Sequence, residues 1–198
     1  MKTIEILCNE LITGATNALF EKNENNVEGA LHLLTGISVN LNGEIIEQQL
    51  SQVTIKEGKD IQRFLLQEGD VVLLAKGNSI KAGYVTKAIA KLSVITSANF
   101  ILLRPNSNEL LGEVLVAYFN SAVGQSQLNA TSTGSIIKNI SLSNIKKIEI
   151  ELPTLNKQHE IAELFHASNQ AYQSTINLAE QQKKVATAYI SQLMKGVA

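Results

Sequence analysis

The 198-residue chain has one cysteine, two prolines, three histidines and no tryptophan. The single thiol, Cys8, excludes an internal disulfide and a cysteine cluster around a metal. The histidines, His32, His159 and His166, have no neighbours that would order them as metal ligands or as part of a catalytic triad. The sequence therefore predicts neither a metal site nor an acyl-transfer site.

Clustered carboxylates and glycine-rich phosphate loops are missing as well. The chain has two aspartates, Asp60 and Asp70, whereas a metal-dependent nuclease needs several acidic groups together. Asp70 follows Gly69 and is interpreted as a turn residue. No G-x-G-x-x-G segment marks a nucleotide-binding methyltransferase. We expect a protein that catalyses no reaction itself and binds no cofactor.

Long apolar runs are also absent. No segment approaches the roughly 18 consecutive apolar residues of a membrane span, and residues 1–5 lack the apolar core of a signal peptide. Hydrophobic residues make up 44% of the chain, which is typical of an ordered protein with one compact domain and an extension. We expect it in the cytoplasm.

The net charge of −1 hides an uneven distribution of charge along the chain. Residues 1–55 carry two lysines against seven glutamates, whereas residues 56–104 carry eight basic against four acidic residues, a net charge of +4. A basic middle third suits contact with DNA phosphates. Charge alone leaves ordinary solvation of this surface equally open.

Strand patterns dominate the first three quarters of the chain. An unbroken apolar run predicts a buried strand at 71–75, and alternation around Asn42-Gly43 predicts a hairpin at 35–46. Further strands are expected at 31–34, 94–104, 135–140 and 145–152, a helix at 109–120, and polar loops at 76–84 and 124–134. These patterns indicate an α+β fold, with a strand-rich globular domain at residues 1–155.

The last third has no proline after Pro153 and no glycine before Gly196. Apolar or small residues recur there at alternating steps of four and three, beside a second apolar column, so residues 156–198 are predicted to form one helix of roughly 60 Å. Because this exceeds what the domain's own core needs, we predict a coiled coil with a second copy; packing along its own domain is the alternative. The residues expected at the dimer contact are Ile161, Leu164, Phe165, Tyr172, Leu178, Val185, Tyr189 and Leu193.

Several segments are similar to those of a known family in order and spacing. They are 67–73 (Gln-Glu-Gly-Asp-Val-Val-Leu), Lys76-Gly77, 97–105, Gly134-Ser135, and Ile148 to Pro153 continuing to Gln158. Together they resemble the specificity subunit of type I restriction-modification systems over most of the chain. Members of this family usually alternate two target recognition domains with two long helices. This chain resembles a half-size form with one of each.

The resemblance implies a non-enzymatic subunit that reads double-stranded DNA for a methyltransferase. It implies modification subunits as partners, and it leaves open whether a restriction nuclease subunit joins or a second specificity chain completes the complex. It also implies an antiparallel homodimer through the C-terminal helix. Two identical readers then predict an interrupted inverted repeat as the target. A coiled-coil adaptor whose globular domain binds protein is the alternative function.

Side chains that read bases are expected on polar loops held by a rigid sheet. Lysines supply phosphate contacts, and Arg63 is the candidate for a bidentate contact to guanine, because the resemblance places Arg104 in a structural strand-end motif. Asn40 or Asn78 is the candidate for adenine, although solvation is an equally open role for each of these residues. The expected DNA-binding residues are Asn40, Lys56, Lys59, Arg63, Lys76, Asn78, Ser79, Lys81, Thr133, Ser135 and Lys138.

Overall fold

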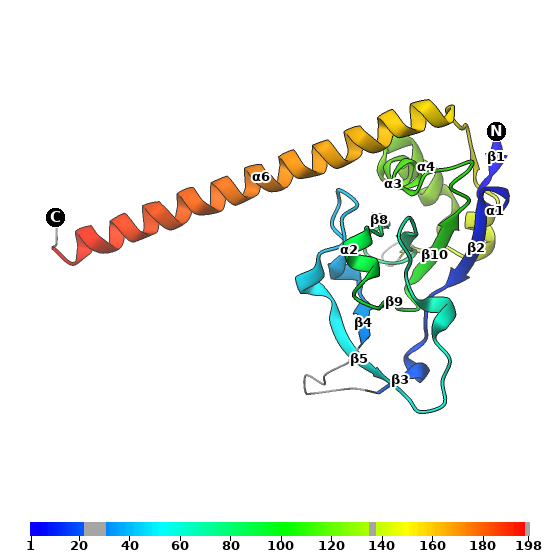
Figure 1. Cartoon of the computed structure of the whole chain (residues 1–198), viewed down its shortest axis with the longest axis horizontal. Coiled ribbons are helices and arrows are strands. Elements are labelled where there is room, and N and C mark those ends of the chain that lie inside the picture. Colours follow the sequence, from blue (N-terminus) through cyan, green and yellow to red (C-terminus); the bar gives the residue numbers. More distant parts are fainter. Residues whose placement is uncertain (22–30, 135–137, 197–198) are drawn as a thin grey trace. The chain divides into compact units, whose positions relative to one another are not determined.

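The computed structural model describes residues 1–21, 31–134 and 138–196. The chain divides into two compact units, Met1–Ala162 and Glu163–Ala198 (Figure 1). The first unit holds all of the strands and five of the six α-helices within the described residues, together with the first two turns of the sixth. The second unit is the remainder of that sixth helix.

A four-stranded antiparallel sheet forms the centre of the first unit. Its strand order is β2 (Cys8–Thr13), β10 (Phe100–Pro105), β6 (Val71–Leu74) and β8 (Lys81–Tyr84). Every residue of β6 is buried, as its unbroken apolar sequence requires of a strand covered on both faces. Helix α3 (Gly112–Asn120) lies against β8 and β6 and covers one of those faces.

A second four-stranded sheet has the order β3 (Phe20–Glu21), β5 (Ser51–Ile55), β4 (Leu31–Leu34) and β9 (Val94–Thr96). Its β4–β9 pair is parallel and the other pairs are antiparallel. Side chains from both sheets, including Leu34, Val94 and Phe100, meet in one apolar cluster, so the two sheets share a core.

Shorter elements complete the unit. Two small sheets pair β1 (Lys2–Thr3) with β12 (Glu149–Ile150) and β7 (Lys76–Gly77) with β11 (Lys138–Asn139). The remaining α-helices are α1 (Ile4–Leu7), α2 (Lys87–Ala90), α4 (Ala122–Thr131), α5 (Leu142–Lys146) and α6 (Leu155–Met194). The 3-10 turns of the described residues are η1 (Asn17–Leu19), η2 (Gly36–Ser38), η3 (Glu47–Gln49) and η4 (Gln62–Phe64).

The expected α+β class is confirmed, as are the buried strand at β6, the strand at β4 and the helix at α3. The long C-terminal helix is confirmed too, since α6 continues for 40 residues.

Several local predictions were wrong. The expected loop at 124–134 is mostly α4, which begins where the Ser121 hydroxyl accepts a hydrogen bond from the Gly124 N–H. The expected loop at 76–84 contains β7 and β8, and the expected strand at 94–104 is two strands separated by residues 97–99. The hairpin at 35–46 reduces to a 3-10 turn and one bridge between Val39 and Ile45.

The predictions of the last two strands, at 135–140 and 145–152, were only partly right. The segment 145–152 begins inside α5 and holds only the two residues of β12. Of the strand expected at 135–140, residues 138–139 form β11, and residues 135–137 lie outside the described ranges.

The first two turns of α6 belong to the globular unit. The Gln158 side chain is 1% exposed and Ala162 is 8% exposed. The Gln158 carboxamide accepts a hydrogen bond from the Leu111 N–H at 3.0 Å and donates to the carbonyls of Glu109 and Pro153 at 2.9 and 3.0 Å. One buried side chain therefore joins the root of α6 to the segment that leads into α3.

Candidate nucleic-acid interface

Two polar segments that are far apart in sequence meet where β7 pairs with β11. Lys138 lies opposite Gly77 and Asn139 lies opposite Lys76. Thr133 extends the pairing, because its N–H and carbonyl exchange hydrogen bonds of 3.0 Å with Asn139. We call Lys76, Asn78, Ser79, Thr133, Lys138 and Asn139 the β7–β11 surface.

Backbone hydrogen bonds anchor this surface to the central sheet. The Ala75 and Lys76 N–H groups donate to the Asn99 carbonyl, and the Ile140 N–H donates to the Ala75 carbonyl at 2.9 Å. Because Ala75 directly follows the buried strand β6, the polar surface stands on a rigid support.

The chemistry of the β7–β11 surface suits contact with a polar, anionic ligand. Lys76, Asn78, Ser79 and Thr133 are exposed. The Lys138 ammonium donates to the Asn129 side chain of α4, and the Thr133 hydroxyl donates to the Asn139 carbonyl. The structure thus brings together five of the predicted DNA-binding residues; a sixth, Ser135, lies outside the described residues.

Asn40 and Lys81 have their polar groups engaged inside the domain. The Asn40 carboxamide accepts hydrogen bonds of 2.9 Å from the Asn42 and Glu44 N–H groups and donates to the Glu44 carboxylate at 2.8 Å. The half-buried Lys81 ammonium donates to the Val39 carbonyl, and burial lowers its pKa. Both residues therefore stabilise the turn that follows η2, and neither belongs to the β7–β11 surface as defined above.

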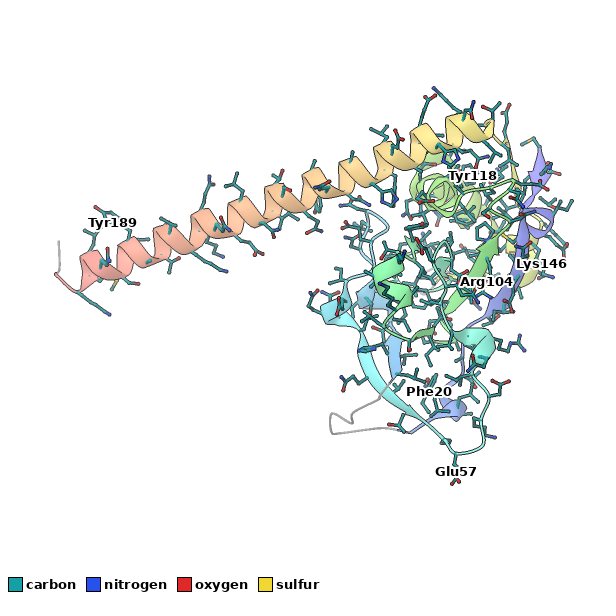
Figure 2. All side chains as sticks on the ribbon, viewed as in Figure 1. Phe20, Glu57, Arg104, Tyr118, Lys146 and Tyr189 are labelled. Atoms are coloured by element: carbon teal, nitrogen blue, oxygen red, sulfur yellow. The ribbon has the colours of Figure 1, made fainter. Side chains whose placement is uncertain are left out.

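A separate basic segment is formed by Lys56 and Lys59, on the connection between β5 and η4, and by Arg63 within η4. All three are exposed, and the Arg63 guanidinium lies over the Phe64 ring, 5.2 Å from its centroid. Figure 2 labels Glu57 at the tip of this connection, at the lower end of the globular unit in that view. These residues extend from the second sheet, and no strand pairing joins their connection to the described parts of β7 or β11.

Arg104, labelled in Figure 2, forms ion pairs within the globular unit. Its guanidinium donates to both carboxylate oxygens of Asp70, at 2.8 and 3.0 Å, and to Glu10 at 2.6 Å. Asp70 is 1% exposed and also accepts from the Gln67 N–H at 2.7 Å. Burial raises the pKa of Asp70 and these hydrogen bonds oppose the rise, while the Asp70 carboxylate raises the pKa of Arg104. The network links β2, β10 and the turn before β6.

Sequence reasoning missed two residues of this region, Asn129 and Asn139. Asn129 was missed because its segment was predicted as a loop rather than as α4. The Ser121 N-cap was the signal that could have revealed the helix. Asn139 faces Lys76 through pairing between segments about 60 residues apart, for which neither segment carries a local signal.

The predicted dimer-contact residues lie on α6. Six of the eight are exposed: Leu164, Tyr172, Leu178, Val185, Tyr189 and Leu193 have exposed fractions between 49% and 71%. Ile161 and Phe165 are half-buried. By itself, the second unit therefore presents a long apolar stripe to solvent.

Within the described ranges, no group of three or more His, Cys, Asp or Glu side chains could hold a metal ion. Across the same ranges, no helix combines the length and the apolar character needed to cross a membrane. Cys8 is buried, and desolvation raises the pKa of its thiol to about 12.

A family model described as "Type I restriction modification DNA specificity domain" matches residues 8–187. The S subunit of a type I restriction-modification system from M. genitalium is similar, with 18% identity and a TM-score of 0.60 over 97% of this chain and 44% of that one. The HsdS subunit from Thermoanaerobacter tengcongensis has 17% identity and a TM-score of 0.60 over 92% and 45%.

A third similar structure comes from work on complex assembly and conformational transition of the type I R-M system. It has 16% identity and a TM-score of 0.57, over 99% of this chain and 47% of that one. The chain thus spans less than half the length of these three structures. No curated protein matches it.

Proposed function

This chain belongs to the type I restriction modification DNA specificity family, whose members are non-catalytic, and we propose that two copies of it read an interrupted inverted repeat in DNA. The observation that carries the proposal is one globular unit joined to one long helix whose apolar stripe is exposed. A C2 dimer through that stripe presents two identical reading surfaces, and these require two identical half-sites.

The β7–β11 surface is proposed to contact the duplex. Lys76 supplies a charge for phosphate, while Asn78, Ser79 and Thr133 supply side chains that can reach base edges. Lys56, Lys59 and Arg63 form a second basic contact, with Arg63 offering a bidentate donor pair to guanine or phosphate.

The proposed partners are two modification subunits, each receiving one half-site from one recognition domain. The complex is proposed to act in the cytoplasm, where a methyltransferase meets chromosomal DNA. A restriction nuclease subunit can join the same assembly without altering the recognition argument.

Two measurements test the proposal. A duplex-binding titration should show affinity falling steeply with salt, because phosphate contacts release condensed counterions; a protein-binding adaptor would show no such duplex binding. Mapping methylated adenines in cells that carry the system should give a palindromic motif with a gap. A single asymmetric motif would overturn the homodimer proposal.

Truncation separates the two units of the chain. Removing the residues after Ala162 should give a monomer that keeps the folded domain, because the buried anchor Gln158 remains. Sedimentation of the full chain as a monomer at tens of micromolar would contradict pairing through α6.

A further inference from the structure

Ile37 is a large apolar side chain that the fold leaves in solvent. It lies in η2, and 70% of its surface is exposed. Among the large hydrophobic residues in the described part of Met1–Ala162, only Met1 and Leu41 are more exposed. Packing within the globular unit therefore does not require an isoleucine at this position.

Hydrogen bonds hold the backbone around Ile37 in one conformation. The fully buried Ser38 hydroxyl accepts a hydrogen bond from the Thr35 N–H at 3.2 Å and donates to the Gln49 carbonyl at 2.7 Å. The Ser38 N–H donates to the Thr35 carbonyl at 3.0 Å, and the Ser38 carbonyl accepts from the Ile46 N–H at 2.8 Å. Because the backbone is fixed and a β-branched side chain has few rotamers, a contact made by Ile37 costs little conformational entropy.

The η2 segment lies beside the loop between β7 and β8. A Cβ atom added to Gly36 or to Gly77 would lie 3.6 or 3.7 Å from the same methyl carbon, Leu74 Cδ2, so both glycines pack against one side chain. Further along the two segments, the Lys81 ammonium donates a hydrogen bond to the Val39 carbonyl. The two segments are therefore in contact at both of their ends.

Ile37 and Asn78 lie on the solvent side of these neighbouring segments. Both side chains are exposed. The residues that face the core are Ser38 and Val39 in the first segment and Ile80 in the second, and all three are buried. An apolar side chain thus stands near the asparagine that is the candidate for reading adenine.

An A·T base pair matches this combination of side chains. In the major groove its adenine presents N6 and N7, which an asparagine carboxamide can bond, and its thymine presents a C5-methyl group, which an apolar side chain can cover. We propose that Ile37 contacts the methyl group of a thymine in the DNA target, in the base pair that Asn78 reads or in the adjacent one. The inference rests on the proposed reading of DNA and names one base feature that the surface recognises.

A protein partner fits this surface less well. The core of a protein interface groups several apolar side chains and contains few charged ones. The residues that follow β6 near Ile37 are polar or basic instead, since Lys76, Asn78 and Ser79 are all exposed there. Leu41, which is 76% exposed, lies in the turn after η2 that packs against α3. A single apolar side chain among polar ones suits contact with one methyl group.

Replacement of thymine by deoxyuridine tests the contact, because it removes only the methyl group and keeps the base pairing. The probe is a duplex target that the full chain selects from random sequence, with each thymine of one half-site replaced in turn. One replacement should weaken binding about fourfold, which corresponds to about 0.8 kcal/mol for burying a group of this size. The same replacement should not affect Ile37→Ala, and a loss of affinity that persists in this variant would overturn the inference.

Ile6→Ala is the matched control. Ile6 is 66% exposed on α1, which packs against β2 and α5, and β2 lies at the opposite edge of the central sheet from β8. Ile6→Ala should stay fully sensitive to deoxyuridine, and Ile37→Val, which keeps the branched methyl groups, should keep most of the sensitivity. Equal loss of sensitivity in Ile6→Ala and Ile37→Ala would refute the assignment to Ile37. Both side chains are exposed, so circular dichroism should show the same fold in every variant.

Target selection with the variants tests the placement beside Asn78. Ile37→Ala and Asn78→Ala should relax the sequence preference at the same base pair or at adjacent ones. Relaxation at positions further apart would overturn the shared reading of an A·T pair.

Failure of this inference is distinguishable from failure of the proposed function. A full chain that binds no duplex would overturn the reading of DNA itself. A full chain that binds its target with unchanged affinity after every deoxyuridine replacement would overturn only the thymine contact. If Ile37→Ala bound DNA like the unaltered chain but no longer joined the modification subunits, Ile37 would belong to a protein interface and the thymine contact would be refuted.

Discussion

Gln158 is the side chain whose loss should most affect the junction between domain and helix. Its carboxamide makes three hydrogen bonds to backbone groups of Leu111, Glu109 and Pro153 while only 1% of the residue is exposed. Replacement by leucine keeps a similar side-chain volume but leaves one backbone donor and two backbone acceptors, all on half-buried residues, without their partner. We therefore propose Gln158→Leu as the decisive perturbation of this junction.

The magnitude follows from those three groups. Leaving a buried polar group unpaired costs about 1–3 kcal/mol, and partial access of water to the two carbonyls reduces the sum. We expect Gln158→Leu to lower the free energy of unfolding by about 3 kcal/mol. For a domain of this size that corresponds to a fall in Tm of about 6–12 °C.

Urea denaturation of the full chain, followed by circular dichroism, measures this change. Asn156→Leu is the matched control, because it makes the same substitution of an amide on an exposed face of the first turn of α6 and should change stability by about 0.5 kcal/mol or less. Equal stabilities of the two variants would show that the Gln158 hydrogen bonds do not hold the junction.

Three further predictions concern the surface and the core. Lys76→Glu should weaken binding to all duplexes alike and reduce the salt slope by about one, while Lys87→Glu, at an exposed position of α2, should change neither. Asn78→Ala should alter sequence preference by about 1–3 kcal/mol at one base pair, and a uniform loss across sequences in a binding-site selection would count against base contact. Burial raises the pKa of the Cys8 thiol to about 12, so the free energy that the protonated thiol contributes to stability should be lost as pH rises from about 9 toward 12. For the same reason, iodoacetamide should label Cys8 at pH 8.5 only after unfolding. Rapid labelling of the native protein, or an identical pH profile for Cys8→Ala, would refute that expectation.

Elements with a strong local pattern were predictable from the sequence. β6 lies within a run of five consecutive apolar residues from Val71 to Ala75, and α6 combines helical periodicity with the absence of proline and glycine. α4 was missed because only Gly124 and Leu128 are buried, so its polar sequence carries almost no apolar period. A helix that is held mainly by an N-cap and a few buried residues has only a weak hydrophobic pattern in its sequence.

The individual site residues were harder to predict because their roles depend on distant partners. Lys81 donates to the carbonyl of Val39, 42 positions away, and nothing near either residue in the sequence indicates that contact. Asn40 is different, since the spacing Asn40-x-Asn42-Gly43 is typical of a turn in which asparagine bonds to the following backbone. That local signal could have assigned Asn40 to the turn.

The pairing of β1 with β12 has a consequence for how longer relatives can be built. Lys2 lies opposite Ile150, so the beginning of the chain lies near the root of α6. In the antiparallel homodimer that the family resemblance implies, the far end of α6 from the second copy lies beside this same root. A short peptide could then join the end of one copy to the start of the other without disturbing either domain. Tandem duplication of a gene followed by fusion would thus yield one polypeptide with two readers that can diverge separately, turning a palindromic target into an asymmetric one.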